Sequence, residues 1–371
     1  MAPRQSAVES VEMKCFGDCF RGRRVLLTGH TGFKGSWLTL WLQMLGARVT
    51  GIALPLEASP SHWELLGLDI EEHRLDIRDA GTLHRAVVEA RPEVVFHLAA
   101  QSLVRRSYRE PLETWSTNVT GTANLLDACR RIPTVRVIVV VTTDKCYENQ
   151  EWPWGYRETD RLGGRDPYSA SKAAAELVVS SYRASFFQGE GAALIATARA
   201  GNVIGGGDWS EDRLIPDLVK GFGEGKPASI RFPNSTRPWQ HVLDPLSGYL
   251  RLSQLLLDGG RGFADAWNFG PDPEGNRTVG EMLGRLQHHW PALSWRIDQD
   301  PQPHESSLLY IDASKARRCL GWRPVYSFED SVRLTADWYR RFQETGTVAS
   351  QRQVDEYLLA AAGAGVTWCE E

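Results

Sequence analysis

The chain has 371 residues, a net charge of −4 and 42% apolar residues, with acidic and basic side chains close to balance. This length is enough for one large domain or for two lobes. The balance of charge gives no indication of a nucleic-acid partner or of an anionic membrane, so an anionic substrate would need a local cluster of cations. No run of eighteen apolar residues occurs, which argues against a membrane span.

The first twenty residues predict a loosely ordered extension without the apolar segment of a signal peptide. The six cysteines are scattered, and the first two lack the partner pair of Cys or His that a zinc finger needs. Free thiols in a reducing cytoplasm are the simplest interpretation of this pattern, and no metal site is expected. The cysteines are Cys15, Cys19, Cys129, Cys146, Cys319 and Cys369.

Up to about residue 200, short apolar stretches alternate with helical ones. A strand over 23–28 precedes a glycine-rich turn over 29–35, a helix over 36–45 and a second strand over 49–54. This order is the βαβ opening of a dinucleotide-binding fold. The continued alternation predicts an α/β protein with a doubly wound, parallel, Rossmann-type sheet. The further expected strands are 73–77, 94–98, 135–141 and 192–198, and the further helices are 80–90, 112–130 and 168–187.

After Gly201 the regular alternation ends, and the remaining chain mixes helices with polar loops. This predicts a smaller mixed α/β lobe at the carboxyl edge of the sheet, where open α/β sheets bind ligands. The expected helices are 214–222, 245–257, 279–289, 313–320 and 354–361, with a short strand over 266–269. We therefore expect an N-terminal extension over 1–20, a dinucleotide-binding domain over 21–200 to which 243–270 returns, a substrate lobe over 201–242 and 271–345, and a C-terminal tail over 346–371.

The glycine-rich turn predicts the cofactor site. Glycines at positions 29, 32 and 35 allow a tight bend and a close approach to a pyrophosphate, and the helix that follows points free N–H groups at this anion. The acid that usually binds the ribose, about twenty residues further on, is replaced here by Ala53-Leu54-Pro55. The choice between NAD and NADP is therefore weakly specified, and Lys34 or Arg48 can favour a 2′-phosphate. Asp76 is either an adenine-side contact or a turn residue.

Two clusters predict the chemistry. Tyr168 and Lys172 are four residues apart and share a helix face, where the lysine ammonium favours the phenolate that can take a hydroxyl proton. An ordinary surface Tyr–Lys pair is the alternative. Thr143, Asp144 and Lys145 end the buried strand over 135–141, at the edge where the cofactor is expected.

Together these motifs resemble the extended short-chain dehydrogenase/reductase family, from about residue 23 to about residue 340. Within that family, the stretches Thr142-Thr143-Asp144-Lys145-Cys146-Tyr147 and Arg237-Pro238-Trp239-Gln240-His241-Val242 resemble the nucleotide-sugar 4,6-dehydratases, and most of all the branch that acts on CDP-glucose. The resemblance implies NAD as a recycled cofactor and a place in deoxysugar biosynthesis. It places the cofactor against Gly29, Thr31, Gly32, Phe33, Lys34, Gly35, Asp76, Ile77, Leu98, Ala99, Ala100, Gln101, Tyr168 and Lys172.

The resemblance also implies a redox-neutral reaction. Tyr168 would deprotonate the 4-hydroxyl of the sugar while the C4 hydride passes to NAD, Thr143 would bind the 4-oxygen, and Asp144 would assist loss of the C6 hydroxyl. In the dTDP-glucose branch a glutamate follows this aspartate, whereas here the residue is Lys145. A lysine acts as a C5 base only where burial or cations lower its pKa. The alternative for Lys145 is an ion pair with Asp144.

The diphosphate of such a substrate needs local cations. Arg213 and Arg237 are the candidates, because a guanidinium binds phosphate oxygens with two hydrogen bonds. Asn202 is a candidate ligand of sugar or phosphate and is equally well explained as a turn residue. His241 and Trp239 are candidates for stacking on the nucleotide, with core packing as the alternative for the tryptophan. Solvated surface side chains are the alternative for the two arginines.

Three further interpretations remain open. A nucleotide-sugar 4-epimerase or C6 decarboxylase would share the glycines, the tyrosine and the lysine, and the substrate can instead be a dTDP- or GDP-sugar. A third candidate is a non-catalytic dinucleotide sensor, which would be expected to have lost Tyr168 or Lys172. The resemblance implies a homodimer, or a dimer of dimers, through the helices over 112–130 and 168–187; packing on the sheet explains their small residues equally well.

Overall fold

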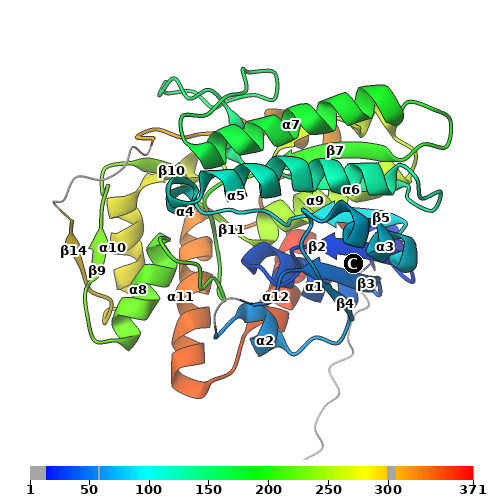
Figure 1. Cartoon of the computed structure of the whole chain (residues 1–371). Coiled ribbons are helices and arrows are strands. Elements are labelled where there is room, and N and C mark those ends of the chain that lie inside the picture. Colours follow the sequence, from blue (N-terminus) through cyan, green and yellow to red (C-terminus); the bar gives the residue numbers. More distant parts are fainter. Residues whose placement is uncertain (1–13, 57–58, 299–305, 371) are drawn as a thin grey trace, which may run out of the picture.

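The centre of the molecule is a seven-stranded parallel sheet (Figure 1). The computed structural model describes residues 14–56, 59–298 and 306–370. The strand order is β12-β7-β6-β5-β2-β3-β4, and every neighbouring pair is parallel. The predicted doubly wound sheet is therefore confirmed. The strands are β2 Arg24–Thr28, β3 Arg48–Ala53, β4 Glu71–Arg74, β5 Val94–His97, β6 Val137–Val141, β7 Leu194–Arg199 and β12 Ala266–Asn268.

Helices cover both faces of this sheet, so its central strands are almost entirely buried. Successive side chains of β6 alternate between two cores: Val137 and Val139 pack in one, and Ile138 and Val140 pack in the other. The helices are α3 Ala80–Ala90, α5 Pro111–Trp115, α6 Gly121–Cys129 and α7 Pro167–Phe186 on one face, and α1 Phe33–Met44 and α9 Leu243–Leu257 on the other (Figure 1).

A smaller group of helices and short strands lies beside the carboxyl edge of the sheet (Figure 1). It holds α8 Leu214–Gly223, α10 Val279–His289 and α11 Phe328–Thr345, with β9 Ala228–Ile230 paired to β14 Trp295–Ile297, and β10 Thr236–Pro238 paired to β13 Asn276–Thr278. The other elements are α2 His62–Leu66, α4 Val104–Arg109, α12 Ser350–Gly363, β1 Lys14–Cys15, β8 Val203–Ile204, β11 Gln240–His241 and β15 Cys369–Glu370.

Several boundaries differ from the sequence expectation. β4 covers Glu71–Arg74, so Asp76 follows the strand end by two residues. The helix expected over 112–130 consists of α5, a π-helical turn over Ser116–Thr120 and α6. α11 was not predicted, although Ser327 and Asp330 form the capping box that marks its start.

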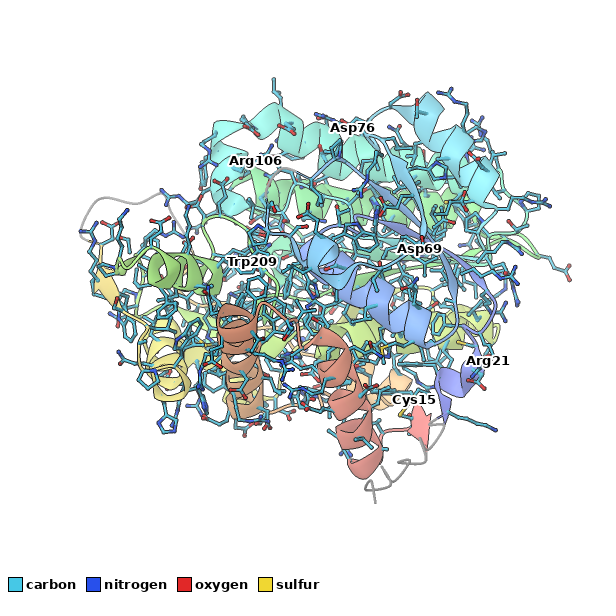
Figure 2. The ribbon with its side chains drawn as sticks, turned by 90° about the horizontal axis from the view of Figure 1, so that it is seen from below. Cys15, Arg21, Asp69, Asp76, Arg106 and Trp209 are labelled. Carbon is cyan, nitrogen blue, oxygen red and sulfur yellow. A yellow bond between two sulfur atoms is a disulfide. The ribbon has the colours of Figure 1, made fainter. Side chains whose placement is uncertain are left out.

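The two ends of the described chain pack together, which corrects two expectations. β1 pairs with β15, Phe16 stacks on Trp368, and a disulfide joins Cys15 to Cys369 (Figure 2). The part of the predicted extension from residue 14 onward is therefore ordered, while residues 1–13 lie outside the described residues. The expectation that all cysteines are free thiols is wrong for this pair. No helix in the described ranges has both the length and the apolar character needed to cross a bilayer.

Candidate active site

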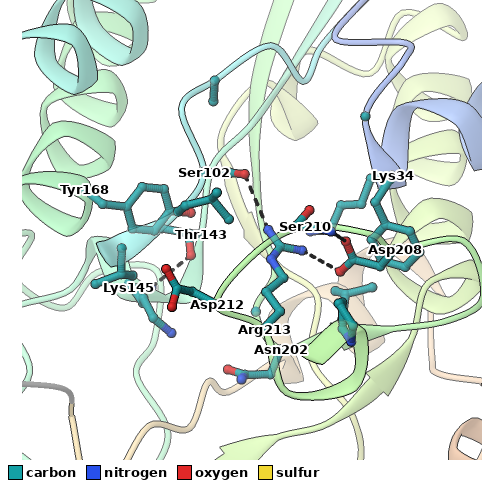
Figure 3. Close-up of a pocket in the computed structure, with 18 of the residues that line it drawn as sticks. Lys34, Ser102, Thr143, Lys145, Tyr168, Asn202, Asp208, Ser210, Asp212 and Arg213 are labelled. Atoms are coloured by element: carbon teal, nitrogen blue, oxygen red, sulfur yellow. Dashed lines mark hydrogen bonds and ion pairs between the residues drawn. The ribbon is translucent and has the colours of Figure 1, made fainter. Parts of the chain in front are cut away.

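A cavity of about 560 Å³ opens at the carboxyl edge of the sheet, between the strand ends and the smaller group of helices (Figure 3). Its lining comes from the glycine turn after β2, the segments that follow β5, β6 and β7, the first turn of α7, and the loop before α8. Of the residues that the sequence predicts for the site, all line this cavity except Gln101 and His241. Segments distant in sequence therefore meet at one place.

The glycine turn is shaped for close backbone approach. Gly29 has φ +76°, and a β-carbon there would lie 2.7 Å from the backbone nitrogen of Ala99. A β-carbon on Gly35 would overlap the carbonyl oxygen of Gly29. Gly32 is the N-cap of α1, and no side chain among the described residues caps this helix, so the first N–H groups of α1 are available to a ligand in the cavity. These features suit a pyrophosphate.

The end of the cavity next to β3 and β4 has apolar walls and a carboxylate. Leu54 and Ile77 line it together with Asp76. The side chain of Arg78 hydrogen-bonds the Asp76 carboxylate at 2.7 Å and holds the pKa of Asp76 below its usual value. An acidic, apolar pocket next to an uncapped helix fits the adenosine and pyrophosphate of NAD. A carboxylate at this end disfavours a 2′-phosphate.

The suggestion that Lys34 or Arg48 binds a 2′-phosphate is not supported. Arg48 starts β3 at the amino edge of the sheet, away from the cavity. Lys34 is turned to the other end of the cavity, where its electrostatic neighbours are Arg213, Asp144, Lys172 and Asp208.

Gln101 supports the site from behind. It is buried, and its backbone exchanges two hydrogen bonds with the Asn118 side chain, at 2.9 and 3.0 Å. The Asn118 amide also donates to the Ser171 hydroxyl at 2.8 Å. This link holds the segment after β5 against α7, so Gln101 positions the cavity wall without forming it.

Tyr168 and Lys172 lie one turn apart on α7, and both are buried. Burial raises the pKa of Tyr168 to about 12, while a hydrogen bond with Thr143 opposes the shift. Burial lowers the pKa of Lys172 to about 8, opposed by Glu176, and its ammonium donates to the Val141 carbonyl at 3.2 Å. In the protein alone, burial therefore outweighs the groups that favour ionisation of Tyr168, of which the Thr143 hydroxyl is the first and Arg213 the second.

Asp144 is fully buried at the end of β6. Its Oδ1 accepts a hydrogen bond from the Thr143 hydroxyl at 3.0 Å, and its Oδ2 has no partner within the described part of the chain. The neighbouring Lys145 is half-buried, and its ammonium makes no ion pair with Asp144 in the described ranges. Both side chains line the cavity together with Tyr168, so an acid, an amine and a phenol meet there.

The side chains expected to bind a diphosphate differ in how they are held. Arg213 pairs with Asp208 at 3.0 Å (Figure 3). Arg237 is buried and donates to the Ser306 carbonyl at 2.7 Å. Asn202 adopts φ +47°, which a turn requires, and its side-chain oxygen is buried without a partner within the described residues. It can therefore serve both as a turn residue and as a polar ligand.

His241 is a misassigned candidate. It is fully buried, packs on Trp37 and Tyr326, and lies outside the cavity lining. Burial lowers its pKa to about 3, so the ring is neutral. Trp239, the other stacking candidate, lies two residues earlier in the chain, outside β11, and does line the cavity.

Sequence reasoning missed the carboxylates that set the charge of the smaller lobe. Asp208 pairs with Arg213, and Asp212 pairs with Arg105 at 3.3 Å and with Arg231 at 3.1 Å. The aspartate of the Gly205-Gly206-Gly207-Asp208 turn is the signal that the sequence offers for them.

The sequence also gave no indication of a buried ion pair under the site. The Glu176 carboxylate accepts from Thr142 at 2.5 Å, Thr197 at 2.7 Å and Arg199 at 2.8 Å. The Arg199 guanidinium also donates a hydrogen bond to the Tyr147 hydroxyl at 2.8 Å. This network joins β6, β7 and α7 beneath Lys172.

Residues 25–263 match the model of the NAD dependent epimerase/dehydratase family. The chain belongs to this family. Its cofactor is accordingly NAD, and the extended short-chain dehydrogenase/reductase resemblance is confirmed. The family match spans every strand of the central sheet except the first residue of β2 and all of β12.

Individual members of the NAD dependent epimerase/dehydratase family are similar to this chain over most of its length. The CDP-glucose 4,6-dehydratase of Salmonella typhimurium is 46% identical over 351 residues, which cover 92% of this chain and 98% of that protein. The crystal structure of the dTDP-glucose 4,6-dehydratase DesIV from Streptomyces venezuelae, with NAD bound, is 28% identical with a TM-score of 0.75, covering 86% of this chain and 98% of the other. The Thermus thermophilus UDP-glucose 4-epimerase complexed with NAD is 25% identical with a TM-score of 0.71, covering 85% and 99%.

Proposed function

We propose that the protein dehydrates CDP-D-glucose to CDP-4-dehydro-6-deoxy-D-glucose with NAD as a recycled cofactor. The observation that carries this is the meeting of Tyr168 and Lys172 with Asp144 and Lys145 in one cavity. The first pair serves the oxidation of a hydroxyl, and the second adds an acid and an amine for the loss of water. The 46% identity with a CDP-glucose 4,6-dehydratase supports this substrate.

Tyr168 takes the proton of the 4-hydroxyl. Its phenol stands next to the Thr143 hydroxyl, which binds the 4-oxygen and opposes the effect of burial on the phenol. Bound NAD supplies the hydride acceptor and donor of the redox-neutral cycle. Lys172 is held by the Val141 carbonyl at the floor of the site, where it orients the cofactor and places positive charge near the phenol.

Elimination requires a proton to leave C5 and the C6 hydroxyl to be protonated, because a 4-ketone acidifies C5 and hydroxide is a poor leaving group. Lys145 removes the C5 proton as the neutral amine and becomes the ammonium, and its nitrogen is not tied up by Asp144 or by another described residue. Asp144 donates to the C6 oxygen through Oδ2, the carboxyl oxygen without a protein partner.

The remaining cavity residues divide between the two ligands. We assign NAD to the glycine turn, to Asp76, Ile77 and the Leu98–Ala100 segment, and the nucleotide sugar to Asn202, Arg213 and Arg237. The domain around the central sheet, including 243–270, thus holds the cofactor, and the lobe over 201–242 and 271–345 holds the nucleotide.

A 4-epimerase on the same scaffold is the second candidate, because an epimerase of 25% identity shares the fold. An epimerase has no use for a buried acid beside an amine at the sugar. Incubation with CDP-glucose and NAD, followed by alkali, should produce the ultraviolet absorbance of a 4-keto sugar. If CDP-, dTDP-, UDP- and GDP-glucose all fail to give it, the dehydratase proposal is wrong.

We also propose a homodimer, or a dimer of dimers, in the cytoplasm. Leu112 on α5 and Leu177 on α7 expose 82% and 61% of their surface, on helices that pack against each other. Covering such side chains with a second copy removes apolar surface from water. Four cysteines of the described chain remain free thiols, which suits a reducing compartment, whereas the Cys15–Cys369 disulfide does not. Light scattering on Leu112→Glu/Leu177→Glu should show a monomer.

A further inference from the structure

Lys34 belongs to the glycine turn by sequence and to the reaction end of the cavity by position. It is the second residue of α1, which begins at Phe33 with Gly32 as its N-cap. Its side chain lines the cavity on the side of Asp208 and Arg213 (Figure 3). It therefore stands between the turn that suits the pyrophosphate of NAD and the arginine assigned to the diphosphate of the sugar nucleotide.

The charge of Lys34 is not neutralised by a direct contact. Arg213 has an ion pair with Asp208 at 3.0 Å, and Arg231 has one with Asp212 at 3.1 Å. In contrast, the Lys34 ammonium makes no hydrogen bond or ion pair within the described ranges. A cation that projects into a cavity without a partner has all its donors available for a ligand.

Keeping this cation costs stability in the unliganded protein. Burial, together with Arg213 and Lys172, lowers the pKa of Lys34 to about 7, against the opposing effect of Asp144 and Asp208. A half-buried ammonium without a partner is unfavourable, and an apolar side chain of similar shape would avoid this cost. A ligand with negative charge would remove it.

We propose that Lys34 is a phosphate-binding residue, whose ammonium contacts a diphosphate oxygen of a nucleotide in the cavity. The proposal rests on the function proposed above only for the identity of the nucleotides. Two ligands of the cavity contain a diphosphate: NAD in its pyrophosphate, and the sugar nucleotide. Lys34 is placed to reach either of them. The backbone N–H groups at the start of α1 bind one anion, and the side chain adds a charge on the reaction side.

The test compares matched ligands on three variants by calorimetry. CDP is compared with cytidine, and ADP-ribose with adenosine, so that each pair differs in its phosphates. Lys34→Met keeps the shape and removes the charge, and Lys34→Arg keeps the charge. Lys226→Met is the control, because Lys226 is an exposed lysine outside the cavity.

Lys34→Met should lower the affinity for CDP, for ADP-ribose or for both by about 10–100-fold, as expected for the loss of a charge-assisted hydrogen bond. The affinities for cytidine and adenosine should be unchanged. If only the affinity for CDP falls, Lys34 contacts the diphosphate of the substrate. If only the affinity for ADP-ribose falls, Lys34 contacts the pyrophosphate of the cofactor. Lys34→Arg should restore most of the affinity. Unchanged affinity for both diphosphate ligands overturns the proposal.

A stability measurement separates binding from a structural role. The ligand-free Tm of Lys34→Met should equal or exceed that of the wild type, because the uncompensated charge is gone. A lower Tm with unaltered affinities would mean that Lys34 is structural, which also overturns the proposal. If Lys34→Met does not fold, Lys34→Gln carries the same comparison. None of these measurements requires turnover, so they fail or succeed independently of the dehydratase assay.

Discussion

Gly201 and Asp144 are packed so closely that a β-carbon on Gly201 would overlap the carboxyl group of Asp144. Asp144 follows β6 and Gly201 follows β7, which are neighbours in the sheet. The missing side chain at position 201 thus creates the space that the proposed acid occupies. The orientation of Asp144 depends on a residue that bears no functional group.

Gly201→Ala should therefore displace the Asp144 carboxyl and slow formation of the 4-keto-6-deoxy product by about 100-fold, as expected for a misplacement of about 1 Å. NAD binding should be unchanged, because the glycine turn is remote from this contact. Gly262→Ala is the matched control, since a β-carbon there meets no atom within 4 Å. Product formation at the wild-type rate in Gly201→Ala would show that the position of Asp144 does not matter.

The sequence predicted the fold well because its signals are local. Apolar strands, the glycine turn and the alternation with helices each depend on neighbouring residues. Asp144 and Tyr168 were identified because their segments end a strand and open a helix at the same edge of the sheet. Parallel strands bring such ends together without further information.

What the sequence could not predict depends on contacts across long separations. His241 lies two residues after Trp239 in the chain, and only tertiary packing decides that the histidine is buried on Trp37. The pairing of β1 with β15 joins residues near opposite ends of the chain. The phenol of Tyr168 was expected to be stabilised as an anion, yet burial outweighs its polar neighbours in the protein alone.

Tyr168→Phe should lower kcat for product formation by at least about 100-fold, because the hydroxyl that exchanges the 4-hydroxyl proton is lost. Affinity for NAD should change by less than about threefold, since the phenyl ring keeps the packing of α7. Calorimetric titration with NAD and the alkali assay measure the two effects. A variant that no longer binds NAD would identify Tyr168 as a structural residue.

Lys145→Met should block elimination while sparing oxidation. The amine that removes the C5 proton is absent, so exchange of this proton with solvent deuterium should cease, while the transient absorbance of NADH at the start of the reaction should persist. Mass spectrometry of the recovered sugar nucleotide measures the exchange. Lys145→Arg serves as the charge-preserving control and should behave like Lys145→Met, because a guanidinium does not act as a base. Undiminished deuterium exchange in both variants would exclude Lys145 as the base.

Asp244 predicts a pH dependence of stability that is independent of catalysis. It is fully buried at the start of α9, where Oδ1 accepts from the Val325 N–H at 2.7 Å and the Tyr357 hydroxyl at 2.9 Å. Burial raises the pKa of Asp244 from 3.8 to about 7. The unfolded chain therefore releases this proton at a lower pH than the folded protein, and stability is lost as the pH rises from about 4 to about 7.

Asp244→Asn keeps the accepting oxygen and removes the titration. Between pH 4 and pH 8 its free energy of unfolding should gain about 2–4 kcal/mol relative to the wild type, because only the wild type must ionise a buried carboxyl. Urea unfolding at both pH values measures this difference, and the exposed Asp337→Asn should follow the wild type. Parallel pH profiles for the wild type and Asp244→Asn would mean that Asp244 is already ionised in the folded protein.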